Sequence, residues 1–158
     1  MAAPLTPSGR EKGPASLLNA VFIGYMVGTY SVIGKGGAQA IANMAGEFVG
    51  RELLAYAKSQ GEGIDSPRAL ADFLQENGLT GTITIEETAG AVVAQIAQCG
   101  ICPKRVGKYK FDGTACPWGG ILIGALGTIM EREFTVSPSL TPAEKCAITL
   151  KPRKTTFL

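Results

Sequence analysis

Histidine is absent from all 158 residues of this chain. Because histidine is the commonest general base and metal ligand of proteins, its absence excludes every Ser-His-Asp and Cys-His catalytic arrangement. Charged residues are also few, at 18%, and the net charge is only +2. No basic run is interleaved with aromatic side chains, so we expect no nucleic-acid partner. With no catalytic constellation in view, the sequence favours a binding protein over an enzyme.

No charged residue occurs between Lys12 and Lys35. The uncharged stretch is long enough to span a bilayer, but residues 16–34 of it contain Asn19, three glycines and two tyrosines, and no small-residue cleavage site follows. We therefore predict a buried helix of a soluble protein and no membrane span. Four cysteines are too few for a disulfide scaffold, which fits a cytoplasmic protein.

The order of the predicted elements indicates one α+β domain. The Gly-rich segment 34–37 is expected to end a first helix, and Ser66 followed by Pro67 is typical of a helix N-terminus. Apolar periodicity and alternation predict helices over 16–32, 38–60, 66–77 and 116–132, and extended segments over 80–87, 91–98, 106–111, 134–136 and 146–150. We expect an antiparallel sheet packed with the N-terminal helices and with one further helix before the last strands.

The predicted domain boundaries lie near the two ends of the chain. Residues 1–15 are rich in proline and glycine, which predicts a flexible arm. Residues 16–152 form the single domain, and residues 153–158 form a loose tail.

Glycines four residues apart recur inside the predicted helices, at positions 24 and 28, 46 and 50, and 120 and 124. Each mid-helix glycine costs about 1 kcal/mol relative to alanine. Close packing of two helices, within the domain or across a dimer, would offset this cost. Alternatively, the small residues leave room for an apolar ligand between the helices and the sheet. Both interpretations remain open at the level of sequence.

Three of the four cysteines lie within one short segment, where Cys99-Gly-Ile-Cys102 follows a predicted strand and Cys116 begins a predicted helix. A tight turn with a glycine can aim both sulfurs of a C-x2-C pair at one ion, and four thiolates close a tetrahedral zinc site without histidine. The helix N-terminus is expected to favour the thiolate of Cys116. We therefore predict a zinc site formed by Cys99, Cys102, Cys116 and Cys146.

Other uses of the cysteines stay open. Zinc is favoured, and the alternatives are small buried apolar residues, a redox-active dithiol at Cys99 and Cys102, and an iron–sulfur cluster. A carboxylate could also replace one sulfur as a metal ligand; the candidates near in sequence are Glu86, Glu87, Asp112 and Glu144.

The segment from Ala115 to Thr149 resembles the 4-vinyl reductase, or hydrocarbon-binding, domain family. It contains Cys116, a Gly-rich helix with the letters GILIGAL, a strand with the letters FTV, and Lys145-Cys146. An upstream segment with the letters AGEFVGREL is similar to the family's A-G-x-x-x-G-x-x-L pattern. The resemblance covers about residues 18–150, and its last third is the most specific.

The resemblance implies a helix-and-antiparallel-sheet domain related in fold to small subunits of the TRAPP vesicle-tethering complex. It further implies a dimer formed through helices, an internal pocket for a small apolar ligand, and zinc bound by cysteines. Cys116 and Cys146 match family metal positions. The chain departs from the family pattern because no second cysteine follows Cys146; the Cys99–Cys102 pair is the candidate for the missing ligands.

Together these features predict a small apolar-ligand-binding domain, for a hydrocarbon or a tetrapyrrole-like molecule, with a structural zinc and a homodimeric state. The alternatives are a TRAPP-like adaptor and a thiol or iron–sulfur redox protein. Large apolar side chains of the predicted helices are the candidates for the pocket lining: Phe22, Tyr25, Met26, Met44, Phe48, Trp118, Ile121 and Leu122.

Overall fold

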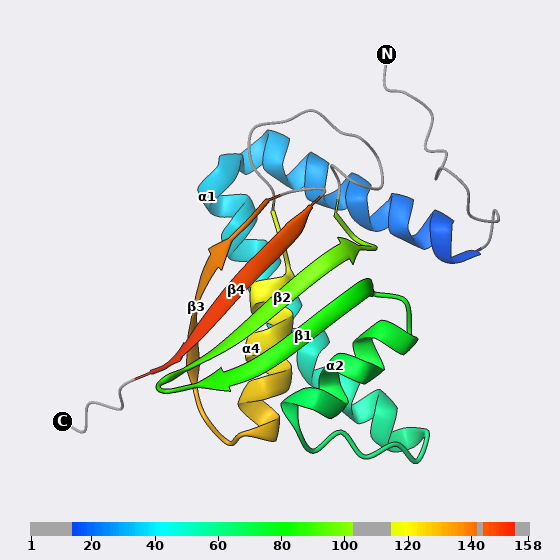
Figure 1. Ribbon diagram of the computed structural model, residues 1–158. Coiled ribbons are helices and arrows are strands. Elements are labelled where there is room, and N and C mark those ends of the chain that lie inside the picture. Colours follow the sequence, from blue (N-terminus) through cyan, green and yellow to red (C-terminus); the bar gives the residue numbers. More distant parts are fainter. Residues whose placement is uncertain (1–13, 103–114, 142–143, 154–158) are drawn as a thin grey trace.

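The computed structural model describes residues 14–102, 115–141 and 144–153 (Figure 1). The described elements are, in chain order, α1 (Pro14–Ser59), α2 (Pro67–Glu76), β1 (Thr80–Thr88), β2 (Ala91–Cys99), α4 (Trp118–Ile129), β3 (Phe134–Ser139) and β4 (Lys145–Pro152). The predicted α+β class is confirmed. The extended segment predicted over 106–111, the N-terminal arm up to residue 13 and the tail beyond residue 153 lie outside the described residues.

The sheet has four antiparallel strands in the order β1-β2-β4-β3. Residues 89 and 90 close the β1–β2 hairpin, and Gly90 adopts a φ of 95°, which a residue with a side chain rarely adopts. The register sets Cys99 opposite Thr80 and Cys146 opposite Ile96. Two cysteines that are far apart in sequence therefore lie in neighbouring strands.

One face of the sheet carries the core. The alternating residues Val92, Ala94 and Ile96 of β2 and Ile148 and Leu150 of β4 are buried in one cluster with most of α4. In Figure 1, α4 and the second half of α1 lie behind this face of the sheet. Helix α2 begins as expected, since the Ser66 Oγ accepts a hydrogen bond from the Ala69 backbone amide at 3.2 Å.

Four glycines form the contact between α1 and α4. A Cβ added at Gly46 or Gly50 would meet the backbone of α4 far inside van der Waals distance, and a Cβ at Gly120 or Gly124 would meet the backbone of α1 in the same way. The two helices therefore pack backbone against backbone, which is the helix-packing interpretation of these glycines. Gly24 does not take part in such a contact, because no atom lies within 4 Å of a Cβ added there.

The first predicted helix ends at the glycines, as expected. Gly34 has non-helical angles, with a φ of 71° and a ψ of −178°, and α1 is two helical halves that meet there at a kink. The first half is not buried as predicted, because much of its apolar surface faces solvent in the single chain, including Tyr25 and Val32. Within the described ranges, no helix is both long and apolar enough to span a membrane.

Candidate functional site

A partly open apolar cavity of about 490 Å³ lies between the two halves of α1 and the start of α4. No charged side chain is among the described residues that line it. Thr29 and Tyr25 contribute the only side-chain hydroxyl groups of that described lining. The lining comprises Phe22, Tyr25, Met26, Thr29, Ala38, Ile41, Ala42, Ala45, Gly46, Val49, Leu79, Ile101, Ala115, Pro117 and Ile121.

The kink at Gly34 creates this cavity, because it brings residues of the first and the second half of α1 together. Met26 of the first half is buried with Ala38 and Ala42 of the second half and with Ala115, which comes just before α4. The side chains of Ala38, Ala42 and Ala115 are small, so they leave space there that larger side chains would fill. Figure 1 shows the first half of α1 crossing the end of the helix-and-sheet layers.

The pocket residues expected from sequence fall into three groups. Phe22, Tyr25, Met26 and Ile121 all line the cavity. Met44 and Phe48 lie on α1 with exposed fractions of 73% and 59% and do not line it. Trp118 and Leu122 are buried in the core between the sheet and the helices.

Several lining residues carried no signal in the sequence. Leu79 precedes β1 and Ile101 follows β2, so only the β1–β2 hairpin brings them to the same end of the sheet. Pro117 follows the predicted metal ligand Cys116, and this is the one indication in the sequence that Pro117 lies near a functional site.

The four cysteines, which are scattered between positions 99 and 146 of the sequence, are gathered near the same end of the sheet. No disulfide joins them, and the thiol of Cys116 is close enough to those of Cys99, Cys102 and Cys146 for their charges to influence it. The Trp118 indole Nε1–H donates a hydrogen bond to the Cys99 Sγ at 3.0 Å. The lone tryptophan thus links α4 to the end of β2.

The electrostatic surroundings keep Cys116 protonated. Burial raises the pKa of its thiol to about 12, with a smaller opposing effect from the Trp118 backbone amide and further raising effects from the other three cysteines. Burial also raises the pKa of Cys99, against the hydrogen bond from Trp118, and that of Cys146. The amide at the helix start does lower the pKa of Cys116, as expected, but burial raises it by more, so the thiol stays protonated in the metal-free protein.

The fit of a metal ion can be judged from the same side chains. Among the residues described, no three cysteine, aspartate or glutamate side chains are arranged so that they could hold a metal ion. Of the carboxylates considered as replacements, Glu86, Glu87 and Glu144 are exposed, and Asp112 lies outside the described residues. A metal site would therefore need the cysteine side chains to turn toward one another.

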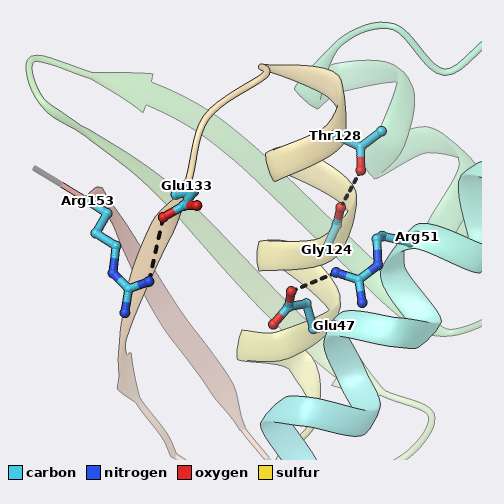
Figure 2. Close-up of polar contacts among 6 residues, drawn as sticks. All are labelled: Glu47, Arg51, Gly124, Thr128, Glu133 and Arg153. Atoms are coloured by element: carbon cyan, nitrogen blue, oxygen red, sulfur yellow. Dashed lines mark hydrogen bonds and ion pairs between the residues drawn. The ribbon is translucent and has the colours of Figure 1, made fainter. Parts of the chain in front are cut away.

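A second, charged hollow of about 420 Å³ flanks the C-terminal half of α4. Figure 2 shows the Glu47–Arg51 pair of α1, at 2.6 Å, and the Glu133–Arg153 pair, at 3.5 Å, on opposite sides of α4. Near them, the Thr128 hydroxyl donates to the Gly124 carbonyl at 2.9 Å. The side chains of these two pairs are at least 44% exposed. The described lining holds as many acidic as basic residues, since Glu131 and Arg132 line it as well, so the hollow favours no ligand of one charge.

The fold has known counterparts among solved structures. The phenol-responsive sensory domain of the transcription activator PoxR, solved with phenol, matches with a TM-score of 0.57 and 14% identity over 90% of this chain and 76% of that one. A vinyl-4-reductase family protein from Methanocaldococcus jannaschii matches with a TM-score of 0.54 and 12% identity, over 92% of this chain and 85% of that one. At these identities the likeness concerns the fold, and it agrees with the fold that the 4-vinyl reductase resemblance implied.

The sequence itself matches a narrower group. The protein MJ0207 of Methanocaldococcus jannaschii is 38% identical over 138 residues, which cover 87% of this chain and 90% of that protein. The model of the MJ0207 family matches residues 30–152, from the end of the first half of α1 to the end of β4. The chain therefore belongs to the MJ0207 family.

Proposed function

We propose that this chain binds a small, neutral, apolar molecule in the cavity between the two halves of α1 and the start of α4. The observation that carries the proposal is a cavity of about 490 Å³ without a charged side chain in its described lining. Ligand pockets commonly span about 300–1,000 Å³ and are mostly apolar with few polar groups. The fold of the phenol-responsive domain, solved with phenol, supports the same class of function.

The chemistry of the lining favours a hydrocarbon over a tetrapyrrole-like ligand. A tetrapyrrole that carries carboxylates would bring negative charge to a cavity whose described lining offers no cation to pair with it. An uncharged ring system loses little hydration on entry, and the Thr29 and Tyr25 hydroxyls can accept or donate one hydrogen bond to a substituent.

A neutral fluorescent aromatic compound, N-phenyl-1-naphthylamine, tests the proposal. We expect saturable binding by the full chain and at least about a tenfold weaker affinity in Ala45→Leu, which corresponds to about 1.4 kcal/mol. Ala45 lines the cavity and is exposed, so the larger side chain enters the cavity without entering the core. Ala55→Leu is the matched control, because Ala55 is an exposed alanine of the same helix outside the lining. No saturable binding, or equal affinity in both variants, would refute the proposal.

A structural zinc held by Cys99, Cys102, Cys116 and Cys146 is the second part of the proposal. The proximity of the four thiols supports it, although their side chains must turn to coordinate one ion. A zinc ion there would link the end of β2, the start of α4 and the start of β4. Elemental analysis of protein purified without oxygen tests it: about one zinc per chain supports the site, iron with sulfide indicates a cluster and a redox role, and neither metal leaves four free thiols.

We also propose a homodimer formed through α1 in a cytoplasmic protein. Within the described residues, every large apolar side chain that is exposed lies on α1, and contiguous apolar surface of this kind commonly marks an interaction site. The same surface favours the alternative of a TRAPP-like adaptor that recruits a different protein. A tight dimer that binds no apolar probe would favour the adaptor.

A further inference from the structure

The apolar cavity has an exposed rim and a buried floor. The rim consists of the lining residues of α1 that are between 38% and 75% exposed, namely Phe22, Tyr25, Ile41 and Val49. The floor consists of the lining residues that are buried together in one small cluster, namely Met26, Ala38, Ala42 and Ala115. A molecule that enters from solvent therefore passes the rim first and reaches the floor last.

Met26 is the only large side chain of this floor. It is 7% exposed, and the other three floor side chains are single methyl groups. Among the described residues, one further side chain, that of the partly buried Tyr30, packs against the cluster, and Tyr30 does not line the cavity. The methionine side chain therefore occupies space that the three alanines leave open.

The floor is separate from the main core. None of its four residues belongs to the cluster of buried residues that joins the sheet to α4. A change of volume at Met26 therefore alters the cavity rather than the packing of α4 on the sheet. Methionine is also unbranched, so it fills an irregular space and tolerates substitution better than a branched core residue does.

The polar groups of the lining lie away from the floor. Methionine and alanine side chains carry no hydrogen-bonding oxygen or nitrogen, whereas Tyr25 brings a hydroxyl group to the rim. An elongated molecule with one polar end therefore loses least hydration when that end stays at the rim. In this orientation the apolar end of the molecule faces Met26.

We infer that Met26 sets the depth of the cavity and that this chain selects apolar molecules by their length. The ligand class is a slender, neutral molecule with one polar end at the rim and an unbranched apolar end at the floor. The inference rests on the proposed function, because it concerns the same cavity. Each methylene that enters the cavity leaves water and strengthens binding about fourfold, until the end of the chain meets the Met26 side chain.

A series of primary alcohols from 1-hexanol to 1-dodecanol measures this depth in the full chain, by displacement of N-phenyl-1-naphthylamine. For the wild type we expect the affinity to rise about fourfold with each methylene and then to level off at one chain length. Met26→Ala shortens the floor side chain to a methyl group. The levelling point should therefore move to alcohols longer by about three carbon atoms.

Two further variants accompany Met26→Ala. Met44→Ala is the matched control, because it is the same substitution on the same helix at a residue that is 73% exposed and outside the lining. It should leave the levelling point at the wild-type length. Ala42→Val enlarges a floor side chain and leaves Met26 in place, so it should move the levelling point to shorter alcohols. Circular dichroism confirms that each variant folds.

The possible results separate the inference from the proposed function. A levelling point that Met26→Ala leaves unmoved, or that Met44→Ala moves equally, would overturn the inference and leave the proposed function standing. So would a wild-type affinity that rises without levelling through 1-dodecanol, because the chain would then leave the cavity instead of ending at Met26. A wild type that binds neither the fluorescent probe nor any alcohol would overturn both. If Met26→Ala does not fold, Ala42→Val decides alone, and an unmoved levelling point there overturns the inference.

Discussion

The side-chain amide of Gln39 binds both backbone groups of Cys116. Its Nε2 donates to the Cys116 carbonyl at 2.8 Å, and its Oε1 accepts from the Cys116 amide at 3.1 Å. Asn43, one turn further along α1, accepts a second hydrogen bond from the same Nε2 at 2.8 Å. One side chain of α1 therefore fixes the start of the α4 segment, beside both the cavity and the cysteines.

Gln39→Leu should destabilise the protein by about 1–3 kcal/mol, because it leaves the amide and the carbonyl of Cys116 without these partners. Urea unfolding followed by circular dichroism measures the change. Gln60→Leu is the control, since the Gln60 side chain is exposed and its amide donates a long hydrogen bond, of 3.4 Å, to the hydroxyl of the adjacent Ser59. Equal stability of the two variants would show that the bonds to Cys116 do not hold α4 in place.

Gly120→Ala should cost about 3 kcal/mol or more, at or above the upper end of ordinary overpacking. The added methyl would meet the Asn43 backbone, which cannot move aside as a flexible side chain would. Gly36→Ala, with no atom within 4 Å and no positive φ, should instead gain up to about 1 kcal/mol from helix propensity. Thermal unfolding of the two variants should shift in opposite directions, and a shift in the same direction would contradict the close packing of α1 on α4.

Gly34→Ala should destabilise by about 1–3 kcal/mol although the space around it is empty. The cost arises from the backbone, because Gly34 holds the kink of α1 with a φ of 71°. Since this kink brings both halves of α1 to the cavity, the variant should also bind the neutral probe more weakly. A gain in stability, as at Gly36, would mean that α1 straightens at no cost.

The stability of metal-free protein should fall at alkaline pH through Cys116. Burial raises the pKa of this thiol from 9.0 to about 12, so the folded state keeps a proton that the unfolded state loses. The contribution is therefore fully present below pH 9.0 and is lost as the pH rises from there toward 12. In chelator, the unfolding free energy of the wild type minus that of Cys116→Ala should fall by up to about 1.4 kcal/mol per pH unit above this point. Parallel pH profiles of the two proteins would rule out a buried neutral thiol.

Arg51→Ala should change stability by no more than about 0.5 kcal/mol. The Arg51–Glu47 pair is short, at 2.6 Å, but both side chains are about half exposed, and water screens such pairs within one helix. The double variant Arg51→Ala/Glu47→Ala closes a thermodynamic cycle that isolates the pair. A coupling energy well above this value would indicate that the charged hollow beside the Arg51–Glu47 pair, drawn in Figure 2, excludes water.

The sequence by itself determined the class of fold and most of the elements. Ser66 and Pro67 begin α2 because a hydroxyl cap and a fixed φ act within one turn. Alternating apolar residues specify β2, because a strand turns every second side chain to the core. These signals are local, so they could be read without knowing what the chain contacts elsewhere. The glycines also predict a break near Gly34. Whether a loop or a kink joins the two helical halves there depends on what α1 packs against.

Only the tertiary structure decided the role of each glycine pair, the lining of the cavity and the protonation of Cys116. Gly46 and Gly24 have the same spacing to a second glycine, yet α4 covers Gly46, while no atom of the described chain lies within 4 Å of a Cβ added at Gly24. The cavity lining joins Phe22, Leu79 and Pro117, which no sequence period relates. Cys116 stands before a helix, which favours a thiolate, but burial among three other thiols raises its pKa to about 12. Burial, contact and charge between distant segments follow from the packing of the whole chain, and a local pattern contains no information about them.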